Sequence, residues 1–444
     1  MLSPNVCRIL GLALLVGSAE LSEAQAPNTS PLWSFSADDD DTPAYGQNNN
    51  GKAAQFGMIS GSQLYVSSYN GHVYQLDLAS GALQADWPVS DYRAYSAPLM
   101  VDGKLYVFAD RGFYRLEKAQ TPRAVKLFEV PAPGTDRPEA LAYDPASGLF
   151  FLSASERVHA VDANGKEKWR LPHFNYGWGQ AMAAGGHLYV FDTRYPASGY
   201  DLNQRKLYKY LPTPEGAHKI WESAPMPEVP FAYLSKGVDG DGDELIFLAA
   251  WQGEADLQGN PVNHGSLSAI YDQGPHAGQT KWSVKLPHTI KHASLWEGKD
   301  TLIVPAMNGK VRWLQASTGK LIREVTLTGG VSQGEKSPWQ QVVLSGDYGI
   351  VMTHDGGAGP DTPNYLFVLD LRDGRELWKS APIRGGGGCM IPVLSGGIAV
   401  VGTYWQGTWH AFRLGEGKPF PFSGFANEAS TGNAPGALTQ LAGK

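Results

Sequence analysis

Apolar and polar residues alternate in short runs along this chain, with the two-residue period of β-strands. Residues 64–81 show the unit most clearly, with one strand around Val66 and a second over Tyr74–Leu76, joined at Asn70-Gly71. Asp77–Gly81 then predicts a turn, because Asp bonds to its own backbone and Gly tolerates positive φ. A single hairpin of this kind cannot bury both faces, so the unit has to be repeated to make a core.

The unit does recur, at spacings of roughly 40 to 57 residues, the range of propeller blades or just above it. Its apolar triplets are Leu64-Tyr65-Val66, Leu105-Tyr106-Val107, Leu149-Phe150-Phe151, Leu188-Tyr189-Val190, Leu245-Ile246-Phe247, Leu302-Ile303-Val304, Ile350-Val351-Met352 and Ile398-Ala399-Val400. The last strand of most units carries a tryptophan, at Trp87, Trp169, Trp221, Trp282 and Trp378, and two units have Phe128 and Val325 nearby instead.

The eighth unit runs out after Leu414 without a fourth strand, whereas Pro31–Phe35 supplies an unaccompanied strand that contains Trp33. We therefore predict an all-β fold, an eight-bladed β-propeller of four-stranded blades closed by the N-terminal strand. The predicted organisation is a signal peptide over 1–26, the propeller over 27–415 and an irregular tail over 416–444.

The pattern resembles the PQQ-type propeller repeat, in which a strand, Asp-Gly, a strand, a Gly connection, Ala-Leu-Asp-x-x-x-Gly and a Trp-bearing strand recur. The resemblance covers about residues 31–415 and is closest at Gly148–Trp169 and Tyr365–Trp378. It implies the fold strongly and the function weakly, because quinoprotein dehydrogenases, outer-membrane-assembly lipoproteins and binding proteins share this repeat.

The N-terminus predicts export. Arg8 precedes a short apolar run over Ile9–Gly17, and Ala24-Gln25-Ala26 fits a cleavage site. We expect a secreted or periplasmic monomer without a membrane span. The net charge of −7 gives no broad attraction to nucleic acid, and none is expected as a partner.

Three units carry long insertions between their second and third strands, over Asp192–Asn203, Trp251–Gly265 and His354–Asn364. Strand order places all three on one face of the ring, opposite the Asp-x-x-x-Gly turns. Long loops on a rigid ring are where ligand contacts usually gather, although tolerated drift in loop length would look the same.

Residues at matching crossings between units should surround the mouth of the central channel on that face. Aromatic rings with convergent polar groups suit a flat ligand such as a quinone or a sugar, although they could equally plug the channel. The predicted ligand-binding residues are Tyr95, Trp178, Arg194, Tyr195, His264, His292, Trp339, His354 and Arg384.

The run Val238–Glu244 resembles a short calcium loop, with Asp239, Asp241 and Asp243 as candidate metal ligands. Alternating Asp and Gly let several carboxylates converge on one hard cation. The run has no bidentate Glu at loop position twelve, so it is not an EF-hand, and a solvated acidic turn is the alternative.

Three functions stay open from the sequence. The first is an exported scaffold that binds a protein or glycan on its long-loop face. The second is a PQQ- and calcium-dependent dehydrogenase, which the resemblance would imply, although the adjacent Cys pair and the haem-attachment motif of such enzymes are absent. The third is a polysaccharide lyase, for which His264, His354, Tyr195 and Arg194 have suitable chemistry. Calcium is thus a candidate cofactor and PQQ a less favoured one.

Overall fold

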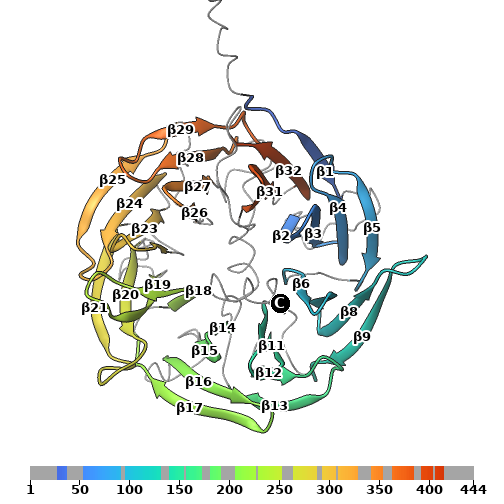
Figure 1. Cartoon of the computed structure of the whole chain (residues 1–444), viewed down its shortest axis with the longest axis horizontal. Helices are drawn as coiled ribbons and strands as arrows, with labels where there is room; N and C mark the ends of the chain where they lie inside the picture. The colour runs from blue at the N-terminus through green and yellow to red at the C-terminus, as the bar shows by residue number, and fades with distance from the viewer. Residues whose placement is uncertain are drawn as a thin grey trace, which may run out of the picture.

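The protein is a ring of eight four-stranded antiparallel sheets, so the predicted propeller is confirmed (Figure 1). The computed structural model describes residues 28–37, 54–91, 96–131, 140–154, 157–172, 181–191, 206–226, 229–252, 264–287, 293–306, 309–328, 342–353, 363–384, 392–403 and 406–414. Each sheet runs from an inner strand to an outer one in chain order, except the sheet that contains both ends of the strand sequence.

The blades are numbered in chain order, and each of the first seven is built from consecutive strands. They are blade one, β2 (Ala54–Ser60), β3 (Gln63–Ser68), β4 (His72–Asp77) and β5 (Leu83–Pro88); blade two, β6 (Leu99–Val101), β7 (Lys104–Ala109), β8 (Gly112–Glu117) and β9 (Arg123–Glu129); blade three, β10 (Ala140–Asp144), β11 (Leu149–Ala154), β12 (Arg157–Val161) and β13 (Glu167–Leu171); blade four, β14 (Met182–Ala184), β15 (His187–Phe191), β16 (Leu207–Thr213) and β17 (Gly216–Glu222); blade five, β18 (Val229–Val238), β19 (Glu244–Gln252), β20 (His264–Tyr271) and β21 (Thr280–Pro287); blade six, β22 (Ser294–Trp296), β23 (Thr301–Ala306), β24 (Lys310–Gln315) and β25 (Leu321–Thr326); and blade seven, β26 (Val342–Ser345), β27 (Tyr348–Met352), β28 (Leu366–Asp370) and β29 (Glu376–Lys379).

Blade eight joins the two ends of the strand sequence. It contains β30 (Val393–Ser395), β31 (Ile398–Gly402), β32 (Thr408–Arg413) and, as its outer strand, β1 (Trp33–Ser36). β1 pairs antiparallel with β32 from Trp33 opposite Ala411 to Ser36 opposite Thr408. The predicted closure by the N-terminal strand is therefore confirmed.

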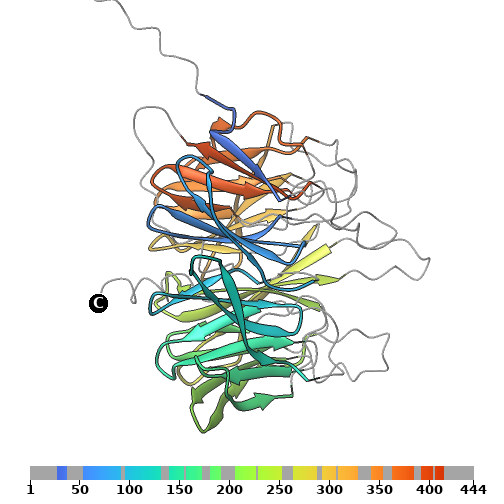
Figure 2. The same ribbon diagram turned by 90° about the vertical axis from the view of Figure 1, so that its right-hand side faces the viewer.

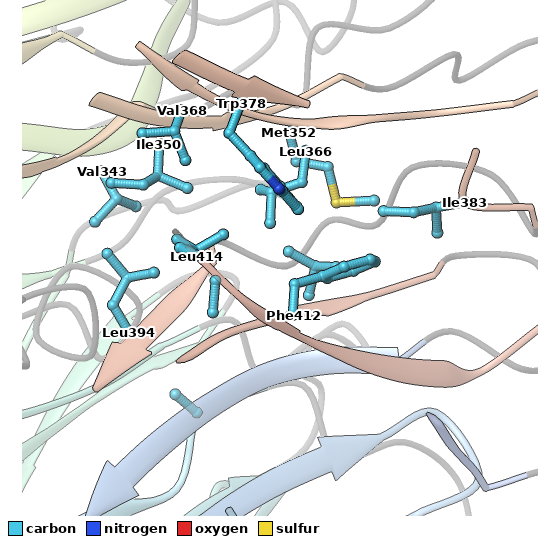
Figure 3. Close-up of a cluster of buried hydrophobic side chains, with 13 residues drawn as sticks. Val343, Ile350, Met352, Leu366, Val368, Trp378, Ile383, Leu394, Phe412 and Leu414 are labelled. Atoms are coloured by element: carbon cyan, nitrogen blue, oxygen red, sulfur yellow. The ribbon is translucent and has the colours of Figure 1, made fainter. Parts of the chain in front are cut away.

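The core lies between blades, because each sheet packs one face against each neighbour. The buried hydrophobic residues form eight clusters among the described residues, one at each junction. The cluster between blades seven and eight contains Trp378, Phe412 and Leu414, and the rings of Trp378 and Phe412 lie edge to face (Figure 3). Second strands such as β11 are buried along their whole length, whereas the outer β9 is partly exposed throughout.

The repeated tryptophans join the blades by hydrogen bonds as well as by packing. In five junctions an outer-strand indole donates to a main-chain carbonyl at or just after the end of the third strand of the next blade, and these pairs are Trp33 to Leu78, Trp87 to Glu117, Trp169 to Thr213, Trp221 to Asp272 and Trp282 to Ala316. Blade six lacks the outer tryptophan, and Trp313 on its third strand makes the equivalent bond to Leu371. Each such bond contributes on the order of 1 kcal/mol.

Two opposite faces of the ring follow from this topology. We call the face where second strands end and third strands begin the insertion face, and the face of the first-to-second and third-to-fourth turns the turn face (Figure 2). Phe191, Gln252 and Met352 end the second strands of the blades with the predicted insertions. All three insertions therefore leave the ring on the insertion face, as predicted.

The bounds predicted for two insertions were wrong. Trp251 and Gln252 belong to β19 and pair with Gly265 and His264 of β20, so the strands of blade five extend further than the apolar pattern indicated. Asn364 forms an isolated antiparallel bridge with Ile383 instead of ending a loop. No helix within the described ranges is long and apolar enough to cross a membrane.

Candidate functional site

Most of the residues predicted at the channel mouth lie outside the described residues. These are Tyr95, Trp178, Arg194, Tyr195, His292, Trp339 and His354. His264 is placed by its main chain only, at the start of β20 opposite Gln252. The side chain of Arg384 is exposed, just after the buried Ile383. The predicted ligand site on this face stays a prediction.

The three predicted metal ligands do converge, and a lysine lies among them. Asp239, Asp241 and Asp243 occupy the turn between β18 and β19 on the turn face, and one carboxylate oxygen of each lies within 4.8 Å of the others. The Lys281 ammonium of β21 donates to all three carboxylates, at 2.6, 2.8 and 2.8 Å. We call this group the aspartate–lysine cluster. The Nζ atom lies where a cation bound by these oxygens would lie, and calcium binding here stays a prediction.

The local sequence explains how this turn holds three carboxylates together. Oδ1 of Asp239 accepts the main-chain N–H groups of Asp241 and Asp243, which leaves Oδ2 for Lys281. Gly242 has φ +87°, a conformation that side chains rarely adopt. Gly240 donates its N–H to Asp300 of blade six and has no room for a side chain, because a Cβ would lie 2.6 Å from the Asp300 Cγ.

Burial and charge are uneven within the cluster. The Asp239 side chain is fully buried and that of Lys281 is 11% exposed, whereas Asp241 and Asp243 are 60% and 41% exposed. Burial opposes the charge of Lys281, but the three carboxylates outweigh it and raise the lysine pKa. The strongest ionic contact is therefore the shielded pair of Asp239 and Lys281, and the cluster has an internal counter-ion at neutral pH.

A second charged cluster joins blades four and five. The buried carboxylate of Asp272 accepts hydrogen bonds from the Tyr189 hydroxyl, at 2.9 and 3.0 Å, and from Lys236. Lys209 lies 3.0 Å from the same carboxylate and also donates to the Asp272 carbonyl. Glu244 lies 3.3 Å from Lys236, so two cations face two anions.

The ionisation of this second cluster is set by the balance between burial and pairing. Burial opposes ionisation of Asp272, but the two lysines outweigh it and lower its pKa. Burial lowers the pKa of Lys209 and raises that of Tyr189. These are residue types used in acid–base catalysis, but their polar atoms are bonded to one another inside a blade junction. The arrangement ties two blades together, with Asp272 and Tyr189 shielded from solvent and Lys236 and Glu244 partly exposed.

The repeat position of Asp272 is a sequence signal for this second cluster. The N–H of Asp272 bonds to Glu244 just as the N–H of Leu78, Ala316, Leu371 and Leu414 bonds at the same point of other blades. Asp272 therefore occupies a position that is apolar in those four blades. A charged residue at a buried position of a repeat requires a partner, and Lys209 and Lys236 supply it.

Comparisons with known proteins support the repeat. A family described as "Outer membrane protein assembly factor BamB" matches residues 18–172, which confirms the PQQ-type repeat in the first part of the chain. The computationally designed Ika8 protein has a similar structure, with a TM-score of 0.56 and 13% identity over 82% of this chain and 97% of that chain. At this identity the likeness shows the fold alone. BamB from Moraxella catarrhalis has a TM-score of 0.45 and 13% identity over 67% of this chain and 80% of that chain, which is too low to carry an argument. No curated protein matches the sequence.

Proposed function

We propose that this protein is an exported interaction scaffold that binds a protein or glycan partner on its insertion face. The observation that carries the proposal is the unequal length of the second-to-third connections on that face. They span 192–206, 253–263 and 353–365 in blades four, five and seven, but only 69–71, 110–111, 155–156, 307–309 and 403–407 in the other blades. A closed ring holds the ends of these connections at fixed separations, which suits a binding surface.

The family match adds independent support. The matching family is named for an outer-membrane protein assembly factor, a role that involves other proteins. Together with the predicted signal peptide over 1–26, this favours a secreted or periplasmic location. N-terminal sequencing of the mature protein should find the chain starting directly after Ala26, in keeping with the cleavage pattern.

The turn face offers less for a partner to bind. Among its charged groups, the aspartate–lysine cluster and the second cluster around Asp272 pair their charges within the protein. A group that is already paired would lose those contacts on binding a ligand, and this cost weakens binding. The insertion face is therefore the better candidate.

The proposal is tested by exchanging the long connections for short ones. In three variants, residues 192–206, 253–263 or 353–365 are replaced by the blade-one connection Tyr69-Asn70-Gly71. Each protein is expressed in the organism from which the protein comes, with a photo-crosslinker at Gln406. Gln406 is an exposed residue of a short connection on the insertion face, and every variant keeps it. We expect a discrete crosslinked partner, identified by mass spectrometry, that is lost in at least one exchange variant. A crosslinker at Ser62 on the turn face is the matched control.

Equal crosslinking from Ser62, or crosslinking that survives all three exchanges, would contradict the proposal. The two enzymatic alternatives are examined on the same purified protein. A rise in Tm that requires PQQ and calcium together would favour the dehydrogenase, because a ligand stabilises the state that binds it. Release of unsaturated products from acidic polysaccharides would favour the lyase.

A further inference from the structure

Histidines on the third strands of three blades point at polar partners on the fourth strand. Nδ1 of His72 lies 2.7 Å from an Asp86 oxygen in blade one, and Nδ1 of His159 lies 2.8 Å from a Glu167 oxygen in blade three. In blade eight the fourth strand is β1, and the partner of His410 is the hydroxyl of Ser34, 2.7 Å from Nδ1. The two histidines within continuous blades thus meet carboxylates, whereas the histidine at the ring closure meets a neutral group.

The other ring nitrogen of His410 is shielded and unpaired. Its Nε2 atom is one of four buried side-chain polar atoms without a hydrogen-bond partner among the described residues, and the Trp378 Nε1 atom is another. The His410 and Trp378 rings both lie near Phe412, with centroids 6.5 and 6.0 Å from the Phe412 centroid. Figure 3 shows Trp378 and Phe412 in the junction between blades seven and eight. The protonated ring carries N–H donors on both nitrogens and a positive charge; the Ser34 hydroxyl can accept from Nδ1, but no acceptor among the described residues faces Nε2.

No charged side chain on the described elements packed against His410 is directed toward it. β1 and β31 contain no charged residue. On β29, Glu376 bonds to Thr328, and Lys379 donates to the Thr328 carbonyl and lies over the Tyr365 ring, so both are directed toward blade six. Arg413 follows Phe412 on β32 and points to the opposite side of that strand, and both it and Arg384 are exposed.

We propose that the ring closure is an acid-sensitive latch, in which protonation of His410 releases β1 from β32. Opening β1 would give the imidazolium access to water and would break the Ser34 contact. Four residue pairs join β1 to β32, and Trp33 of β1 also donates to the Leu78 carbonyl, so opening breaks that bond as well. The first seven blades keep all their strands, and blade eight keeps β30, β31 and β32.

Burial is the only cause that acts on the pKa of His410, and it lowers that pKa from 6.5 to about 4. The closed state therefore binds a proton less readily than the open state. The free energy by which the neutral histidine favours the closed state is fully present above about pH 6.5 and is lost as the pH falls toward about 4. The opening equilibrium of β1 should rise about tenfold for each pH unit over that window, which is about thirtyfold at pH 5 relative to pH 7.5.

The test is hydrogen exchange of the full-length protein between pH 7.5 and 4.5, followed by mass spectrometry of the peptide that contains Trp33–Ser36. Labelling times are scaled for the intrinsic pH dependence of amide exchange. We expect the wild type to lose protection in this peptide on acidification. His410→Asn keeps a polar partner for Ser34 but cannot titrate, so this variant should lose at least tenfold less protection. His72→Asn is the matched control, because His72 lies on a third strand but contacts Asp86 within its own blade, and it should behave as the wild type does.

A second variant covers the case in which His410→Asn does not fold. Ser36 and Thr408 are cross-strand partners whose hydroxyl oxygens lie 3.4 Å apart, so Ser36→Cys with Thr408→Cys, on a Cys389→Ser background, should lock the latch with a disulfide. The oxidised variant should keep its protection at pH 5, and the reduced variant should lose it. Equal loss in the oxidised and reduced forms, or no loss in the wild type, would overturn the proposal.

Discussion

Removal of the Lys281 ammonium tests whether that side chain is the resident cation of the aspartate–lysine cluster. In Lys281→Met the apolar stem is kept and the charge is lost. The buried Asp239 carboxylate then loses its counter-ion, and breaking a buried pair from one side costs about 3 kcal/mol. The contacts to Asp241 and Asp243 are mostly exposed to solvent and add less than about 1 kcal/mol each.

The same variant should acquire an affinity for calcium. Three carboxylates with one oxygen each within 4.8 Å are a donor set that a hard cation accepts, and in Lys281→Met no ammonium competes for it. At a calcium concentration ten times the Kd, binding should restore about 1.4 kcal/mol. Wild-type protein should gain less stability from calcium than the variant does, because binding would first have to displace Lys281.

The assay is urea unfolding of both proteins with calcium and with chelator. Lys285→Met is the matched control, because Lys285 lies on the same strand and is exposed. The reasoning is refuted if Lys281→Met is no less stable than Lys285→Met. It is also refuted if calcium stabilises the wild type as much as the variant, since Lys281 would then not be the cation that the three carboxylates retain.

Three further predictions test two junctions between blades and one ion pair within blade four. Gly81→Ala should destabilise the ring by at least about 2 kcal/mol in urea, because φ is +71° and the new Cβ would lie 2.6 Å from the β1 tryptophan. Gly61→Ala is the control for backbone strain alone, because Gly61 has φ +60° and open space around it. Equal losses in the two variants would contradict the packing argument. Asp272→Asn should cost about 3 kcal/mol, because it leaves the buried Lys209 without its counter-ion and Lys236 with Glu244 alone, and a loss below about 1 kcal/mol would mean that the cluster is solvated. Hydrogen bonds from Lys206, and from a second lysine, lower the pKa of Glu222 from 4.5 to about 2, so its stabilisation is present above pH 4.5 and is lost as the pH falls toward 2. Glu222→Gln should flatten that part of a plot of stability against pH, and an unchanged slope would contradict the ion pair.

The architecture was predictable because the sequence signals for each blade lie within that blade. The alternation of apolar residues, the Asp-x-x-x-Gly turns and the outer tryptophans act within about 40 residues, the length of one repeat. The closure was predictable for a different reason: Trp33 belongs to a repeat position that the eighth unit leaves empty. The missed bounds of β19 and β20 show where this reasoning stops, since Gln252 and His264 pair with each other without any apolar signal.

The turn of Asp239, Asp241 and Asp243 was readable as a place where carboxylates converge, because it is local. Its cation was not readable, because Lys281 lies on another strand and only the register of blade five brings it there. The partner of His410 was still more remote, since Ser34 lies 376 residues away in the sequence.

The contrast among the third-strand histidines shows how the ring closure, where β1 pairs with β32, differs from the continuous blades. A histidine within a continuous blade has its fourth-strand partner a few residues further along, so one short segment supplies both groups, as it does for His72 with Asp86 and His159 with Glu167. At the ring closure the partner comes from the opposite end of the chain, and that strand has no charged residue. At the closure the His410 ring faces the neutral Ser34, so among the three described histidine contacts of this kind it is the one without a carboxylate partner.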